Sequence, residues 1–99
     1  MTTLRTLECL IAMVDHGSVS AAAAALNMSQ PALSHQIAAL EKELGVPVVE
    51  RMWRGVPVTA AGHASAEQAR IALEAAAQAV RMGRRVAQAA AFVSLASRR

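Results

Sequence analysis

The amino-acid sequence predicts a mainly α-helical protein: a winged helix-turn-helix, made of three helices and a small two-stranded wing, followed by one long linker helix. Apolar residues recur at spacings of three and four in separate segments before residue 45, which is typical of short amphipathic helices. Valines and prolines then cluster between residues 46 and 58, and an alanine-rich segment follows from residue 60. These patterns divide the chain into a domain at residues 1–59 and a linker or dimerisation helix at residues 60–99.

Composition limits the kind of protein that this can be. Apolar residues make up 55% of the 99 residues, but the alanine-rich segment between residues 18 and 40 holds too many polar side chains to lie in a membrane. The N-terminus lacks the pattern of a signal peptide, and the single cysteine excludes an intrachain disulfide. The acids are not paired with a nucleophile. We therefore expect a cytoplasmic protein that is not an enzyme, without cofactor, metal, small-molecule site or membrane partner.

Charge is distributed unevenly along the chain. The formal net charge is +3, yet no Asp, Glu, Lys or Arg occurs between Gly17 and Leu40. Five arginines and no acid follow Val80. If the segment from Gly17 to Leu40 binds a partner, it does so through neutral polar groups.

Two helices are predicted before residue 27. The first is amphipathic and ends at Gly17, which suits a left-handed helix stop; its apolar positions are Leu4, Leu7, Leu10, Ile11 and Val14. Ser18 can cap the second helix, which runs from Ala21 to Leu26. Cys9 falls within the apolar pattern and is expected to be a small core residue.

A third helix is predicted to follow a short break. Ser29 can cap it, Pro31 suits its first turn, and Gly45 ends it. One buried stripe is expected along it, formed by Leu33, Ile37, Leu40 and Leu44. Two helices joined by a short turn, the second with a polar start, form the helix-turn-helix layout.

The wing and the last helix complete the expected fold. Val46, Val48 and Val49 form one short strand and Val56 and Val58 the other, with Gly55 at the turn. Thr59 can cap the last helix, which begins at Ala60. Its three-four alternation predicts a seam that packs on the same helix of a second copy in a homodimer, formed by Ala66, Ala69, Leu73, Ala76 and Val80.

The run from Ser29 to Ile37, SQPALSHQI, followed by Leu40-Glu41 and Leu44-Gly45, closely resembles the recognition helix of LysR-type transcriptional regulators. The agreement extends from Gly17-Ser18 to Gly62 and so covers most of the first 62 residues in the right order. Molybdate-responsive regulators share the layout but match this stretch less well. The resemblance implies a transcription regulator that binds double-stranded DNA as a dimer on an interrupted palindrome.

The resemblance also implies roles for particular residues. The third helix would enter the major groove and present to base edges the side chains of Gln30, Pro31, Ala32, Ser34 and His35. Neutral polar groups would bond phosphates, from Ser18, Ser20, Ser29 and Gln36. Lys42 and Arg51 would supply charge to the DNA backbone, and Arg54 at the wing tip would reach the minor groove. Gln30 suits adenine, or another base edge through a single hydrogen bond.

Members of this family carry an effector domain after the linker helix, and we expect none in this chain. That leaves two alternatives, a truncated regulator or a stand-alone DNA-binding domain. A rival function is a helix-mediated protein-interaction module that pairs residues 60–80 with a full-length relative.

Overall fold

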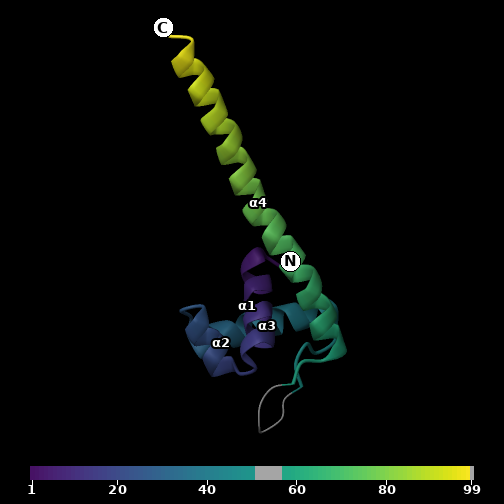
Figure 1. Ribbon diagram of the computed structural model, residues 1–99. Coiled ribbons are helices and arrows are strands. Elements are labelled where there is room, and N and C mark those ends of the chain that lie inside the picture. Colours follow the sequence, from purple (N-terminus) through teal and green to yellow (C-terminus); the bar gives the residue numbers. More distant parts are fainter. Residues whose placement is uncertain (51–56, 99) are drawn as a thin grey trace.

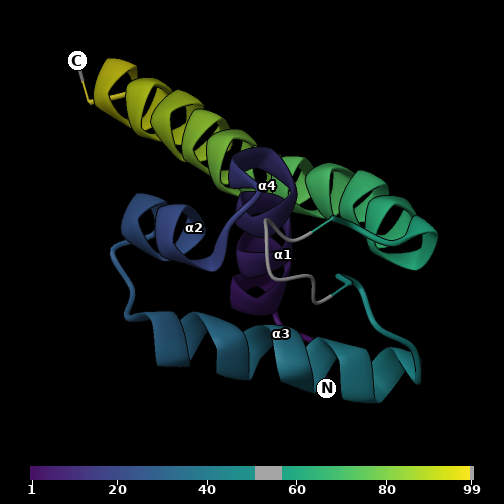
Figure 2. The same ribbon diagram turned by 90° about the horizontal axis from the view of Figure 1, so that it is seen from below.

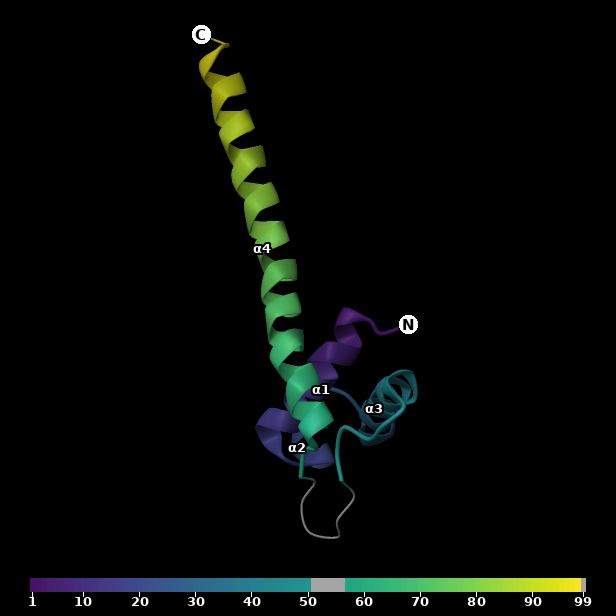
Figure 3. The ribbon, with the colours of Figure 1, turned by 90° about the vertical axis from the view of Figure 1, so that its right-hand side faces the viewer.

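The computed structural model describes residues 1–50 and 57–98, which form α1 (Leu4–His16), α2 (Val19–Ala25), α3 (Gln30–Leu44) and α4 (Ala60–Ala96). The three short helices make a small body, and α4 extends far beyond it (Figure 1). Figure 3 shows the same arrangement from the side, with the C-terminal end of α4 distant from the other helices. The predicted architecture of three helices followed by one long helix is confirmed. Within the described ranges, no helix is both long and apolar enough to cross a membrane.

The predicted helix boundaries are set by local hydrogen bonds. Ser18, Ser29 and Thr59 each precede a helix, and each side-chain oxygen accepts a hydrogen bond of 3.0–3.2 Å from the backbone N–H three residues further on. Gly17 and Gly45 end α1 and α3 with φ values of 70° and 77°, a conformation that favours glycine. The caps and stops expected from the sequence are therefore confirmed.

Helix α1 lies at the centre of the body. It packs against α2, α3 and α4, and Figure 2 shows it between α3 and α4. Its inward face supplies Cys9, Leu10 and Met13, none of which is more than 1% exposed. Cys9 is thus a core residue as predicted, and burial raises the pKa of its thiol.

Helix α3 is buried along one side only. Leu33, Ile37 and Leu40 are 0–6% exposed, which confirms most of the predicted stripe. Leu44 was expected to continue it, but that prediction is wrong, because Leu44 is 41% exposed. At this level the neighbour of α3 is the N-terminal segment before α1, where the hydroxyl of Thr2 donates a hydrogen bond to Glu43.

The base of the wing is paired as predicted. Val49 and Val58 form an isolated antiparallel bridge, and a backbone hydrogen bond of 2.8 Å lies beside it. Val46, by contrast, belongs to no strand and is 47% exposed, so the first predicted strand begins too early. The remainder of the predicted hairpin, residues 51–56, lies outside the described residues.

A close junction joins the wing base to the start of α4. The Thr59 N–H donates to the carbonyl of Val48 at 2.9 Å, and the Thr59 hydroxyl donates to the carbonyl of Pro47 at 2.8 Å. A Cβ atom added to Gly62 would lie only 2.2 Å from the Val48 carbonyl oxygen and 2.7 Å from a methyl carbon of Val58. Glycine at this position is what lets the helix approach the wing base so closely.

The first turns of α4 pack against the body of the same chain. Ala66 and Ala69 are 3% and 1% exposed, and Leu73 shares a hollow with Ile11 and Ala12 of α1. The predicted intersubunit seam therefore needs correction at Ala66 and Ala69, because side chains covered by their own chain are not free to contact a second one. Further along that seam, Ala76 is half-buried and Val80 is 58% exposed.

An ion pair also fixes α4 on α1. The guanidinium of Arg70 donates two hydrogen bonds to the carboxylate of Asp15, one of them 3.3 Å long. Both side chains are about half exposed, so solvent screens the pair. The hydrogen bonds from Arg70 lower the pKa of Asp15.

We predict opposite effects of the same substitution at two glycines of α4. Gly62→Ala should lower the free energy of unfolding by about 1–3 kcal/mol, because the new methyl group meets the backbone of Val48. Gly83→Ala is the matched control, since its Cβ would meet no atom within 4 Å, and it should raise stability by about 0.5–1 kcal/mol. Urea unfolding followed by circular dichroism measures both. A Gly62→Ala variant as stable as the parent would show that the junction is loosely packed.

We also predict a pH-dependent effect of Asp15→Asn. Because folding lowers the pKa of Asp15, the contribution of the ion pair is fully present above the unfolded pKa near 3.8 and is lost as the pH falls through the lower folded value. The variant should melt slightly below the parent at pH 7, and the two should converge in acid. Glu67→Gln, which removes an exposed acid elsewhere on α4, is the control. A gap that persists at pH 2 would mean that packing, not charge, is lost.

Candidate nucleic-acid interface

The N-terminal half of α3 presents one continuous exposed surface. All the residues predicted to meet base edges are exposed, and so is the capping residue before them: Ser29, Gln30, Pro31, Ala32, Ser34 and His35. The buried side chains Leu33 and Ile37 hold the other side of these turns to the body. The exposed polar helix start that the sequence predicts is therefore confirmed.

Two of the predicted phosphate ligands also cap helices. The hydroxyl oxygens of Ser18 and Ser29 accept hydrogen bonds from the backbone N–H groups of Ala21 and Ala32. A hydroxyl that accepts through its oxygen keeps its own hydrogen to donate. Each serine can thus cap its helix and donate to an anion at the helix start. Ser20 is exposed in the first turn of α2.

Gln36 lies differently from the other predicted contacts. Its side chain is half-buried toward α1, where its amide oxygen accepts a hydrogen bond of 2.8 Å from the hydroxyl of Thr6. Thr6 is itself only 4% exposed. Gln36 therefore links α3 to α1, and only its NH₂ group has donors to offer a phosphate. The sequence reasoning missed Thr6, although its spacing from Thr3, with which it forms a capping box, could have drawn attention to it.

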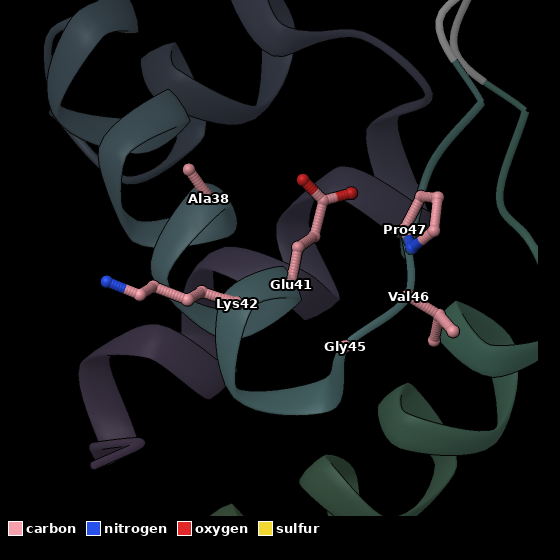
Figure 4. Close-up of a pocket in the computed structure, with 6 residues that line it drawn as sticks. All are labelled: Ala38, Glu41, Lys42, Gly45, Val46 and Pro47. Carbon is pink, nitrogen blue, oxygen red and sulfur yellow. The ribbon is translucent and has the colours of Figure 1, made fainter.

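Glu41 connects α3 to the wing. Its carboxylate accepts a hydrogen bond of 2.9 Å from the backbone N–H of Val48. Figure 4 shows this side chain directed toward the segment around Pro47, on one side of a hollow that Lys42 and Val46 also line. The bond fixes the entry to the wing relative to the exposed face of α3. The sequence analysis used Glu41 only as part of a motif and did not assign it this role.

The turn between α2 and α3 contains a second residue that the sequence reasoning missed. Asn27 has a φ of 54°, a left-handed conformation that asparagine tolerates better than most residues. Its N–H donates to the carbonyl of Ala24 at 3.1 Å, and Met28 N–H donates to that of Ala23 at 2.9 Å. This tight turn sets the angle between α2 and α3.

Formal charge lies around the exposed face rather than on it. Lys42 is exposed near the end of α3. Arg5 pairs with Glu8 at 2.8 Å and donates to the carbonyl of Leu26 at the end of α2. The two other cations expected to meet DNA, Arg51 and Arg54, lie outside the described residues.

This arrangement defines a class of protein. A helix whose polar start is exposed, a tight turn to a preceding helix, and a paired wing base after it together make a winged helix-turn-helix, the architecture in which a recognition helix is presented to nucleic acid.

Comparison with known proteins identifies the family. A family model described as "bacterial regulatory helix-turn-helix protein, lysR family" matches residues 4–63. The HTH-type transcriptional regulator TcbR of a Pseudomonas species is 49% identical over 70 residues, which are 71% of this chain and 24% of that protein. The chain belongs to the LysR family, and it spans about a quarter of the length of the curated relatives it matches.

Solved structures show the same fold. The CbnR DNA-binding domain in complex with DNA superposes with a TM-score of 0.82 at 44% identity, covering 86% of this chain and 98% of that one. The BenM DNA-binding domain bound to its benA site 1 DNA gives 0.81 at 40% identity, covering 86% and 96%. Both of those proteins were solved on DNA.

We predict that Glu41→Ala loosens the wing entry. The substitution leaves the backbone N–H of the buried residue Val48 without its acceptor. It should therefore lower the free energy of unfolding by about 1–3 kcal/mol. Glu41→Gln is the matched control, because its amide oxygen can still accept the bond. Hydrogen exchange at the Val48 amide measures the effect directly. Equal protection in all three proteins would remove Glu41 from the wing's support.

Proposed function

We propose that this chain binds double-stranded DNA in a sequence-specific manner and regulates transcription, with α3 in the major groove and the wing in the minor groove. The observation that carries the proposal is the one-sided burial of α3, which leaves the start of the helix free to enter a groove. The family assignment and the two DNA complexes with the same fold support it.

The exposed residues of α3 divide by chemistry. Gln30 carries an amide that can form two hydrogen bonds with the N6 and N7 edge of adenine. Pro31 and Ala32 offer apolar contact to a thymine methyl group. Ser34 and His35 lie one turn further along and offer single hydrogen bonds. Specificity on this face comes from neutral groups.

Backbone contacts surround this face. Ser18, Ser20 and Ser29 donate to phosphates from helix starts, and Gln36 does so through its NH₂ group. Lys42 and Arg51 supply charge to the DNA backbone, and Arg54 enters the minor groove from the wing. Because each chain supplies only a few charged groups, the salt slope should come mainly from Lys42, Arg51 and Arg54.

The chain acts as a homodimer in this proposal. Pairing through α4 places two copies of α3 in successive major grooves of an interrupted palindrome, about 34 Å apart. Much of α4 is available for such pairing, because it is exposed from Gln78 to Ala96. The corrected positions Ala66 and Ala69 take no part.

Selection from a pool of random duplexes tests this function. Repeated rounds of binding and amplification should enrich one sequence with two-fold symmetry. Enrichment of a single half-site would support base recognition without the dimer. If no sequence outcompetes bulk DNA, specific recognition is wrong.

We predict that alanine substitutions on α3 relax specificity. Gln30→Ala should reduce, by about tenfold, the preference for the enriched site over the same site with its adenine contact changed, which is equivalent to roughly 1.4 kcal/mol. Gln78→Ala, the same change on exposed α4, is the matched control.

Lys42→Ala should instead weaken binding to all duplexes and reduce the salt slope by about 1. Fluorescence anisotropy across salt concentrations separates these effects, and identical discrimination in the Gln30 and Gln78 variants would remove Gln30 from the recognition set.

A second candidate function is a helix-mediated interaction module. Large apolar side chains on α4, such as Val86, Phe92 and Leu95, are 65–72% exposed and could pair with a full-length relative. Substituting both Gln30 and Ser34 separates the two functions. If the chain acts by binding DNA, the double substitution should abolish that binding. If the chain acts as an interaction module, capture of a partner through α4 should persist in the same variant.

A further inference from the structure

The exposed start of α3 carries a single titratable side chain, that of His35. Between Gly17 and Leu40 the sequence contains no Asp, Glu, Lys, Arg, Cys or Tyr, and His35 is the one histidine of that stretch. Its side chain is exposed on the surface that also presents Gln30 and Ser34. This part of α3 therefore has no permanent charge, and one of its positions can change charge between pH 5 and 8.

The neighbours of this imidazole along the helix are small. Residues three and four positions away lie next to it on a helix surface, and all four are exposed: Pro31, Ala32, Ala38 and Ala39. None of them has a polar side-chain atom, so none can hydrogen-bond to the ring through its side chain. The imidazole of His35 is also the longest side chain of the group, so these neighbours leave it free to reach a partner.

The charged groups of the helices that pack against α3 are engaged elsewhere. Helix α2 contains no charged residue. On α1, Arg5 pairs with Glu8, and Asp15 pairs with Arg70 of α4. The last turn of α1 adds His16.

The charges of α3 itself and of the described part of the wing lie further along the chain. Glu41 accepts a hydrogen bond from the wing entry, and Glu43 accepts one from the N-terminal segment. Lys42 lies about two turns beyond His35, and Glu50 is exposed at the wing base. Among residues 1–50 and 57–98, therefore, no ion pair holds His35 in one charge state.

Protonation changes what an imidazole can bind. The neutral ring has one N–H donor and one acceptor nitrogen, whereas the charged ring has two donors and no acceptor. In the major groove guanine presents two acceptors, N7 and O6, while adenine and cytosine also present amino donors, N6 and N4. The neutral ring can accept from those amino groups, but the charged ring cannot. Protonation thus favours guanine over adenine and cytosine.

We infer that His35 is a proton-dependent specificity residue, whose charged form selects guanine at one position of the DNA site. This inference rests on the DNA binding proposed above and names a determinant of its specificity. A hydrogen bond from a charged donor is stronger than one from a neutral donor, so contact with guanine stabilises the charged form. The complex then binds more protons than the free chain. Affinity for the guanine-containing site therefore rises as the pH falls.

Selection from random duplexes at two pH values tests this specificity. At about pH 5.5 the parent should prefer guanine at one position of the site about tenfold more strongly than at about pH 8. His35→Gln should select the same base at both pH values. His35→Arg should select guanine at both, because its guanidinium stays charged and bonds guanine through two donors.

A second histidine provides the matched control. His63 is exposed on α4, away from α3 in the sequence, so His63→Gln should keep the pH dependence of the parent. Loss of that dependence in His63→Gln, or its persistence in His35→Gln, would overturn the inference. All the substituted side chains are exposed, so the variants should fold like the parent, which circular dichroism checks.

Calorimetry counts the protons directly. Titration of the selected duplex in two buffers with different heats of ionisation should show proton uptake by the parent near pH 6.5, and the uptake should be lost in His35→Gln. The same duplex with its guanine replaced should also abolish the uptake. Equal uptake on both duplexes would place the histidine on the DNA backbone and overturn the guanine contact.

The experiments separate this inference from the function on which it rests. If no duplex outcompetes bulk DNA at either pH, sequence-specific binding itself is wrong. If one site is enriched equally at both pH values, with the same base preferences in the parent and in His35→Gln, specific binding stands and the role of His35 is refuted.

Discussion

The one-sided burial of α3 is the constraint on which the rest of the structure depends. Leu33, Ile37 and Leu40 hold the helix to the body formed with α1 and α2, with almost no exposed area. Because these residues recur at spacings of four and three, only one side of the helix is used, and its opposite side stays free. A recognition surface of this kind needs no loop to position it. The exposed side of α3 is therefore as rigid as the body on which the helix packs.

The supports of α3 come from hydrogen bonds at its two sides. Gln36 is held by the hydroxyl of Thr6 on α1, and Glu41 holds the backbone of Val48 at the wing. These bonds add directional constraints to the orientation about its own axis that the apolar stripe already gives α3, because hydrophobic contact itself has no preferred direction. The polar residues around the exposed face of α3 therefore divide between two groups. Some are free to contact a partner, and others hold α3 to its neighbours.

Much of the fold could be predicted because interactions between residues close in sequence determine it. Caps at Ser18, Ser29 and Thr59 act within three residues, and a helix stop at Gly45 needs only its own backbone conformation. Such signals are complete in a short stretch of sequence. The exposed start of α3 could be predicted for the same reason, since the periodicity that marks the buried side marks the free one too.

The features that could not be predicted depend on which element of the fold packs against a given residue. The three-four alternation of Ala66 and Ala69 correctly indicated a helix packed on another helix, but periodicity does not say whether that helix belongs to the same chain. The same limit applies to Leu44, which continues the spacing of the stripe but is 41% exposed. Thr6, Glu41 and Asn27 were missed because their partners lie on other elements or in an irregular turn. The roles assigned to Arg51 and Arg54 stay predictions.

Small residues explain how closely α4 approaches the rest of the chain. On the inner side, Gly62, Ala66 and Ala69 let α4 lie close to the wing base and the body, where a larger side chain at Gly62 would meet backbone atoms. The contact of α4 with the body is close because it does not depend on long flexible side chains. The direction of α4 is therefore tied to that of α3 through α1, against which both helices pack.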